Sequence, residues 1–355
     1  MSACLYGSTE EGGIANIVHY PTIRGAMFST MKSFARATAL ALAPSLIIVA
    51  AGCSPGEKAA TDTTTAKAAD TAAATPAMLT SAGTTDSMKT PESVRYDADL
   101  DAYFISNING NPSVKDGNGF IVKVDAGNTS AVTMFVQSGK GGVTLNAPKG
   151  IAIVGDTLWV ADIDAVRAFN KRTGAVIANI DLKPMKAVFL NDVAAGPDGA
   201  IYITDTGIKF DDKGAMSHPG QDQIFKITGH KAEVAFKSES ALKNPNGIAW
   251  DGANNRFVLA PFNDKVVTAW KVGDSTVTPI ATGPGGYDGI EVLTDGRVLV
   301  TSWADSSVQV IANGAVRKVV ANVDGPADIG VDTKRNILAV PRFNAGRVDY
   351  FTIGR

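Results

Sequence analysis

The chain has 355 residues, of which 45% are hydrophobic and 19% charged, so it is long and apolar enough to bury a sizeable core. Its 33 lysines and arginines nearly balance its 35 aspartates and glutamates. No basic run accompanies this balance, which argues against a nucleic-acid-binding protein.

The N-terminal part of the chain is predicted to lie outside the folded domain. Residues 1–26 have no clear pattern and are interpreted as lying upstream of the true start. Residues 27–52 are typical of a secretory signal, with Lys32 and Arg36 ahead of an apolar run over 37–51. That run is too short and wrongly flanked for a transmembrane helix.

The sequence Val49-Ala50-Ala51-Gly52-Cys53 resembles a bacterial lipoprotein cleavage box. It predicts cleavage before Cys53 and a lipid on its sulfur; the alternative is an ordinary signal peptide. Residues 53–90 are rich in Ala, Thr, Ser, Lys and Asp, which is typical of a disordered tether. The only other cysteine, Cys4, precedes the signal, so we expect no disulfide and no cysteine metal site. The expected product is an exported bacterial lipoprotein, periplasmic or outer-membrane-associated, held to the membrane by its lipid alone.

Six short segments of the remaining chain resemble one another. Most lead into an alternating run, a turn containing Gly or Asp, and a second β-rich run. They recur at intervals of about 40 to 57 residues, which indicates small sheets stacked radially. The segments are 91–94, 148–151, 190–193, 245–248, 287–290 and 326–329. Residues 91–355 are therefore predicted to form one all-β domain, a six-bladed β-propeller of four-stranded antiparallel blades, expected to be monomeric.

Two polar insertions, 107–119 and 207–221, follow the second strand of their repeats. The chain returns along that strand to the face where the inner strands begin, so both insertions are expected there, as walls or a lid over a pocket. The last repeat has room for about three strands. We expect a strand from the residues before Glu92 to complete it and remove the exposed edges. Asp328, in this closing repeat, is expected to fix a turn.

One repeat position is predicted to direct its side chains toward a common axis. Two carboxylates and two amide oxygens at this position suit calcium or magnesium better than zinc, so calcium is expected, with Mg²⁺, Mn²⁺ and Zn²⁺ as alternatives. Such a metal can polarise an ester carbonyl and activate water. The position is occupied, in chain order, by Glu92, Lys149, Asn191, Asn246, Asp288 and Ala327. Taken singly, Asn246 and Asp288 also fit Asn-Gly and Asp-Gly turns, but the position that all four oxygen donors share favours a site.

Four motifs resemble the pattern of the gluconolactonase and regucalcin (senescence marker protein) family, from about residue 90 to the C-terminus: Pro91-Glu92-Ser93, Leu190-Asn191-Asp192, Pro245-Asn246-Gly247 and Asp288-Gly289. The resemblance implies a six-bladed propeller with a central divalent metal that hydrolyses sugar lactones or related esters. It also implies that Glu92, Asn246 and Asp288 bind the metal and that Asn191 contacts metal or substrate. By the same resemblance Asp288 is the candidate general base for the water that attacks the acyl carbon.

The sequence also departs from that family. Phe189 stands two residues before Asn191, where characterised sugar lactonases carry a substrate-contacting arginine, so a more apolar lactone or ester is favoured. Lys149 either offsets a carboxylate and weakens metal binding, or binds a substrate carboxylate or an oxyanion. A further alternative is a lysine whose stem lines the central tunnel while its ammonium reaches water. His218 is either an acid or base near the pocket mouth or a solvated loop residue. The expected catalytic residues are Asp288, Lys149 and Asn191, and the expected substrate contacts are Asn191, Lys149, Phe189 and His218.

A non-catalytic ligand- or protein-binding propeller, anchored at the membrane, is the competing interpretation, because propellers host many functions. Such a module has no need for Glu92, Asn191, Asn246 and Asp288 together. A lyase resembling the streptogramin-cleaving propellers is a third class, but it requires a histidine in the ring, and the six ring positions hold none. The sequence therefore favours a metal-dependent hydrolase of lactones or esters.

Overall fold

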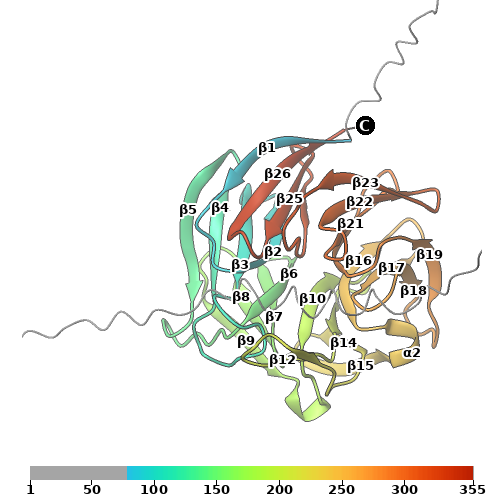
Figure 1. The fold of residues 1–355 in the computed structure, drawn as a ribbon. Coiled ribbons are helices and arrows are strands. Elements are labelled where there is room, and N and C mark those ends of the chain that lie inside the picture. The colour runs from blue at the N-terminus through green and yellow to red at the C-terminus, as the bar shows by residue number, and fades with distance from the viewer. Residues whose placement is uncertain (1–77, 355) are drawn as a thin grey trace, which may run out of the picture.

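The computed structural model describes residues 78–354, which form six four-stranded antiparallel sheets arranged around a central axis (Figure 1). This confirms the predicted six-bladed propeller. The predicted signal peptide, the lipidation site at Cys53 and the tether up to residue 77 lie outside the described residues. Within residues 78–354, no helix is long and apolar enough to cross a membrane.

Each blade begins with its innermost strand. Blade 1 comprises β2(Pro91–Asp97), β3(Ala102–Asn107), β4(Phe120–Asp125) and β5(Asn128–Gln137). Blade 2 comprises β6(Pro148–Val154), β7(Thr157–Asp162), β8(Ala165–Asn170) and β9(Val176–Asp181). Blade 3 comprises β10(Leu190–Ala195), β11(Ile201–Asp205), β14(Gln223–Thr228) and β15(Lys231–Lys237). Blade 4 comprises β16(Pro245–Asp251), β17(Arg256–Pro261), β18(Val266–Trp270) and β19(Thr278–Thr282). Blade 5 comprises β20(Tyr287–Val292), β21(Val298–Ser302), β22(Ser307–Ala312) and β23(Ala315–Ala321). A hairpin of β12(Lys209–Phe210) and β13(Met216–Ser217), a 3₁₀ turn η1(Lys183–Met185) and the short helix α2(Glu239–Leu242) lie between strands.

Blade 6 is closed by the N-terminal strand, as the sequence predicted. It contains β24(Gly330–Asp332), β25(Ile337–Arg342) and β26(Arg347–Ile353), and β1(Leu79–Thr85) pairs with β26 as its outermost strand (Figure 1). The propeller thus begins by residue 79, which corrects the predicted boundary between tether and domain at residue 91. The exact position of this expected strand could not be identified from the sequence, because an edge strand needs few apolar residues and only the two ends of β1 are buried.

The hydrophobic core is divided among the interfaces between neighbouring blades. Between blades 6 and 1, Tyr103 packs against Tyr350 with ring centroids 5.2 Å apart. Between blades 3 and 4, Tyr202 packs against Phe257 at 4.6 Å. Because the apolar faces of the strands are used between blades, the ends of the inner strands remain available for polar groups around the axis.

Candidate metal centre

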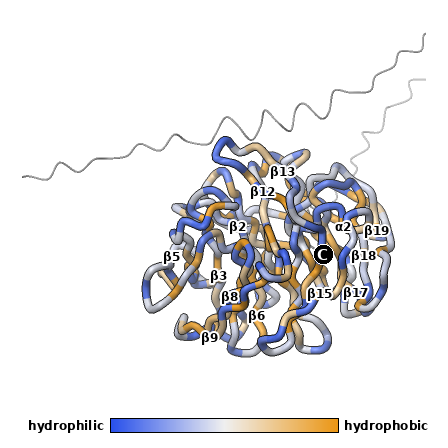
Figure 2. The backbone as a smooth tube through the Cα atoms, turned by 90° about the horizontal axis from the view of Figure 1, so that it is seen from below, coloured by the Kyte–Doolittle hydropathy of each residue, from blue (hydrophilic) through white to orange (hydrophobic). Residues whose placement is uncertain are grey.

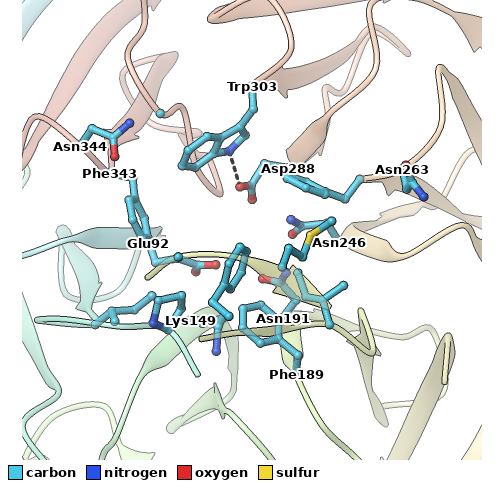
Figure 3. Close-up of a pocket in the computed structure, with 18 of the residues that line it drawn as sticks. Glu92, Lys149, Phe189, Asn191, Asn246, Asn263, Asp288, Trp303, Phe343 and Asn344 are labelled. Carbon is cyan, nitrogen blue, oxygen red and sulfur yellow. Dashed lines mark hydrogen bonds between the residues drawn. The ribbon is translucent and has the colours of Figure 1, made fainter. Parts of the chain in front are cut away.

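The predicted ring is assembled at the floor of one cavity of about 450 Å³. Five of its six side chains line this cavity, each from the start of the innermost strand of blades 1 to 5. Figure 3 shows the four with oxygen atoms directed toward its centre. None is more than 5% exposed. They are Glu92, Lys149, Asn191, Asn246 and Asp288. The sixth position, Ala327, is buried and adds no polar group.

A break in strand pairing aims these side chains at the axis. In β2 the register with β3 shifts between Pro91 and Val94, so the shift spans the ring residue Glu92. Equivalent shifts span the ring residues of β6, β10, β16 and β20. A β-bulge places an extra residue in one strand and re-aims its side chain. One irregularity, repeated in five blades, therefore builds the site.

The Asn-Gly and Asp-Gly pairs of the ring lie within strands β16 and β20, and not in turns. Their glycines permit neighbouring inner strands to approach closely. A Cβ on Gly247 would lie 2.2 Å from the carbonyl oxygen of Asp288, and one on Gly289 would lie 2.5 Å from the Cα of Asp328. These residues are glycine because a side chain there would collide with the next blade.

Three buried oxygen atoms of the ring have no hydrogen-bond partner within the described residues: Glu92 Oε2, Asn246 Oδ1 and Asp288 Oδ1. Buried polar atoms without partners are rare, because leaving one unpaired costs about 1–3 kcal/mol. Oxygen donors of this kind are the ligands that calcium prefers. No three Asp, Glu, His or Cys side chains within residues 78–354 gather closely enough to hold a metal by themselves, so a metal held here would also need the oxygens of the two amides.

Neighbouring side chains orient two ring members. Asn191 Nδ2 donates to Thr206 Oγ1 at 3.0 Å, which leaves the amide oxygen to act as a ligand. Trp303 Nε1 donates to Asp288 Oδ2 at 2.7 Å, so the other carboxyl oxygen stays unpaired (Figure 3). Partners that orient ligands in this way typically support a metal site.

Burial controls the ionisation of the ring. Burial, and then the charges of Asp288 and Asp328, raise the pKa of Glu92 well above its usual value. Burial also raises the pKa of Asp288 to about 8, although the indole N–H of Trp303 opposes this shift. A divalent cation would favour the ionised form of both carboxyls, so its binding would release protons.

Lys149 is a buried ammonium with few partners. Its Nζ donates to the carbonyl oxygen of Ala147 at 3.3 Å and lies 4.1 Å from the centre of the Phe189 ring. Burial lowers its pKa to about 8, against the attraction of nearby carboxylates led by Glu92. It forms no ion pair with any residue in 78–354, so N–H donors remain for a ligand oxygen in the cavity.

Of the two other predicted substrate contacts, the structure brings only one to the cavity. Phe189 lines the cavity and packs edge-on against Phe210, with ring centroids 5.9 Å apart. His218 does not line the cavity; its Nε2 pairs with Asp222 Oδ1 at 2.8 Å. The other oxygen of Asp222 accepts from the backbone N–H of Asn244 at 2.6 Å. His218 therefore helps to fix the loop after β11 in place and does not reach the ring.

Two aspartates that the sequence reasoning missed hold the ring strands in place. Asp162 ends β7 and accepts from the backbone N–H of Ala147 at 2.9 Å, just ahead of the ring lysine of blade 2. Asp205 ends β11 and accepts from the backbone N–H of Phe189 at 2.8 Å. The available signal was an acidic residue at the end of the second strand in two successive repeats.

Both long insertions reach the cavity, as the sequence predicted. The β3–β4 loop contributes Ile108 and Pro112 to its wall, and the loop after β11, with the hairpin, contributes Ile208, Phe210 and Met216. The hairpin of β12 and β13 stands at one end of the molecule in Figure 2. The walls above the polar floor are therefore largely apolar.

A second charged layer lies farther along the inner strands, with Arg95 and Glu291 three residues after the ring members of their strands, and Asp192 and Asp328 one residue after theirs. Arg95 of β2 pairs with Glu291 of β20, and its Nη2 lies 3.4 Å from Asp328 Oδ2 and 3.9 Å from Asp192 Oδ1. Ser93 Oγ donates to Asp328 Oδ2 at 2.5 Å. Asp328 thus bridges to the neighbouring blade at the axis, which corrects the prediction that it fixes a turn.

The comparisons with known proteins agree with this architecture. The family model described as the SMP-30/Gluconolactonase/LRE-like region matches residues 90–331. Among solved structures, a luciferin-regenerating enzyme aligns with a TM-score of 0.57 and 14% identity, over 76% of this chain and 95% of that one. Regucalcin from Agrobacterium tumefaciens, a calcium-binding protein, aligns with a TM-score of 0.56 and 15% identity, over 78% of this chain and 96% of that one.

At these identities the structural likenesses support the fold alone. No curated protein matches the chain. The family match, in contrast, covers most of the propeller and includes every ring position. The chain therefore belongs to the SMP-30/gluconolactonase/LRE-like family.

Proposed function

We propose that this protein is a divalent-metal-dependent hydrolase of lactones or related esters, with calcium as the expected metal. The observation that carries the proposal is the set of unpartnered buried oxygens on Glu92, Asn246 and Asp288 at the floor of one cavity. Membership in the family supports it, as does the calcium binding of the similar regucalcin.

In this proposal Glu92, Asn191, Asn246 and Asp288 hold the ion, which when bound supplies Lewis-acid polarisation of the carbonyl and a more acidic water. Asp288 takes the proton of the water that attacks the acyl carbon and returns it to the leaving alkoxide oxygen when the acyl C–O bond of the lactone or ester breaks, and its indole partner keeps the carboxyl oriented. Lys149 donates N–H groups to the oxygen that gains negative charge. The apolar walls keep bulk water away from these groups, which strengthens each electrostatic interaction.

The test is a calcium titration by calorimetry on the full chain carrying Cys53→Ser, followed by hydrolysis assays on a panel of lactones and esters. We expect binding that is lost in Asp288→Ala and activity that a chelator abolishes. Asp324→Ala is the matched control, because Asp324 lines the same cavity outside the ring. An absence of calcium binding in the parent protein would contradict the proposal.

A non-catalytic ligand-binding propeller is the second candidate, and the buried ammonium of Lys149 favours it, since a resident positive charge opposes a cation. Lys149→Met separates the two. For a hydrolase, the substitution should tighten calcium binding and slow turnover. For the binding propeller, calcium binding should be absent in the parent protein and should emerge only in the variant.

We also propose that the protein is exported and anchored by a lipid on Cys53, so that it meets the membrane only through that lipid and acts as a monomer in the periplasm or at the outer membrane. The support is the signal pattern of residues 27–52 followed by Cys53. Cys53→Ser should shift the protein from the membrane to the soluble fraction of a bacterial host. Membrane association that survives this substitution would contradict the proposal.

A further inference from the structure

We propose that the cavity selects a lactone or ester with an apolar, unhydroxylated body, such as a γ-lactone with an alkyl chain, in preference to a sugar lactone. This inference rests on the proposed function and names the substrate class of the same site. It depends on how polar groups are distributed between the floor and the walls of the cavity.

Aromatic side chains from four blades surround the polar floor. Phe189 and Phe210 come from blade 3, Phe262 from blade 4, Trp303 from blade 5 and Phe343 from blade 6. Trp303 and Phe343 pack edge-on with ring centroids 5.6 Å apart, in the same manner as the pair from blade 3. Ordered aromatic walls of this kind favour apolar ligands, which gain from the surface that they bury.

The two long insertions hold their apolar residues against the cavity without a ligand. Asn111 Nδ2 of the first donates to the carbonyl oxygen of Asp211 in the second at 3.1 Å. The backbone N–H of Phe210 donates to Ser113 Oγ at 2.9 Å. Met216, at the edge of this wall, is 47% exposed. An exposed methionine beside the cavity offers an adaptable apolar contact for an entering chain.

Polar side chains above the floor are confined to one side. Asn263, Ser306, Asp324 and Asn344 belong to blades 4 to 6, and the last two are paired with each other, Nδ2 to Oδ1, at 3.0 Å. The wall that the loops of blades 1 and 3 form contains no polar side chain. A sugar lactone carries hydroxyl groups around its ring, and each needs a partner when it leaves water. The side chains that line the wall from the loops of blades 1 and 3 cannot supply one.

The separation of polar groups on the floor from apolar groups on one wall also orients the ligand. Lys149 and the ring oxygens at the floor attract the ester carbonyl, which is the one strongly polar group of an alkyl lactone. Its chain then extends along the wall of Phe210 and Met216. Each methylene placed there should tighten binding about fourfold, the factor that corresponds to about 0.8 kcal/mol.

Binding of substrate analogues that cannot be hydrolysed separates this inference from catalysis. The probes are 3-alkylcyclopentanones, the carbon analogues of γ-alkyl lactones, with chains from propyl to hexyl, and an inosose, a polyhydroxylated cyclic ketone. Calorimetry on the full chain carrying Cys53→Ser, in chelator and then in calcium, should give affinity that rises with chain length and inosose binding at least about 100-fold weaker. Phe210→Asn and Met216→Asn should flatten the dependence on chain length. Met134→Asn is the control, because Met134 is equally exposed but lies on β5, away from the cavity.

Affinity that is independent of chain length, or inosose binding as tight as that of the hexyl ketone, would overturn the inference. The proposed function has its own readout. Chain-length-dependent binding without any calcium-dependent hydrolysis would support the apolar site and refute the hydrolase. Calcium-dependent hydrolysis with a preference for hydroxylated lactones would support the hydrolase and refute the apolar site.

Discussion

Two polar layers surround the propeller axis, and they differ in how their charges are satisfied. In the ring layer, Glu92 and Asp288 each keep a buried oxygen without a partner. Three residues farther along the same strands, Arg95 pairs with Glu291 and approaches Asp328. One oxygen of Asp328, Oδ1, also has no hydrogen-bond partner within the described residues, but the other accepts from Ser93 and lies near Arg95. Asp192 and Asp328 of the second layer are as buried as the ring, and Arg95 and Glu291 are only partly exposed, so burial alone does not distinguish a site from a structural cluster. The cation of the second layer pairs directly with a carboxylate, whereas Lys149 of the ring layer pairs with no carboxylate among the described residues, so the unpaired carboxylate oxygens face a space that a metal cation would fill.

The largest expected effect follows from removing the cation of the second layer. Arg95→Met leaves the carboxyls of Glu291, Asp328 and Asp192 buried without their partner, which should cost about 3–5 kcal/mol of the free energy of unfolding. Urea unfolding at pH 8 measures the change. Arg172→Met is the control, since Arg172 is half exposed and its ion pairs should contribute about 0–1 kcal/mol. A loss no greater than that of the control would remove the distinction between the layers.

The ring layer should respond in the opposite way. Asp288→Asn replaces a carboxyl ligand whose Oδ1 contacts no described protein donor, so calcium affinity should fall at least about 100-fold while stability in chelator is kept or improved. Asp328→Asn in the second layer should instead lower stability and change calcium affinity by less than about threefold. Calorimetry and unfolding on both variants test this crossover. Equal effects of the two substitutions on calcium affinity would show that the layers act as one site.

The pH dependence of stability tests the second layer without removing its cation. Burial raises the pKa of Glu291 from 4.5 to about 7, although Arg95 opposes the shift. The folded protein then holds more protons than the unfolded chain between these values, so this contribution to stability is present below pH 4.5 and is lost as pH rises through 7. Glu291→Gln should reduce the change in the free energy of unfolding across this window by about 1–2 kcal/mol, less than the full shift implies because the carboxyl is 17% exposed and screened by solvent. Parallel stability profiles for parent and variant would contradict the shift.

The smallest expected effect concerns the support of the ring. Trp303→Phe keeps the aromatic wall but removes the N–H that orients Asp288, so calcium affinity should fall about tenfold. Calorimetry measures the affinity, and circular dichroism checks the fold. Trp250→Phe is the matched control, because Trp250 packs on Phe257 and does not line the cavity. An unchanged affinity in Trp303→Phe would mean that the strand alone orients Asp288.

Much of the site could be predicted from the repeats. Equivalent positions of a repeated blade must lie at equivalent distances from the axis, so Glu92 and Asp288 were expected to meet although they belong to different blades. The same reasoning identified the two insertions as cavity walls. It misplaced Asp328, because a short Ala-Asp pair near a closing repeat has the composition of a turn, and only pairing with the neighbouring blade places it at the axis.

The sequence by itself determined the number of blades, the ring of oxygen donors and the face on which the long loops lie, since each follows from a periodic pattern that local chemistry imposes. The tertiary structure alone decided which charges are satisfied. Arg95 and Glu291 are 196 residues apart, and no local pattern relates them until the ring of blades closes. The apolar wall likewise forms only where loops from blades 1 and 3 meet. A periodic sequence pattern cannot identify residue pairs that form only when the ring of blades closes, because each repeat specifies its own strands and not the distant strand across the axis.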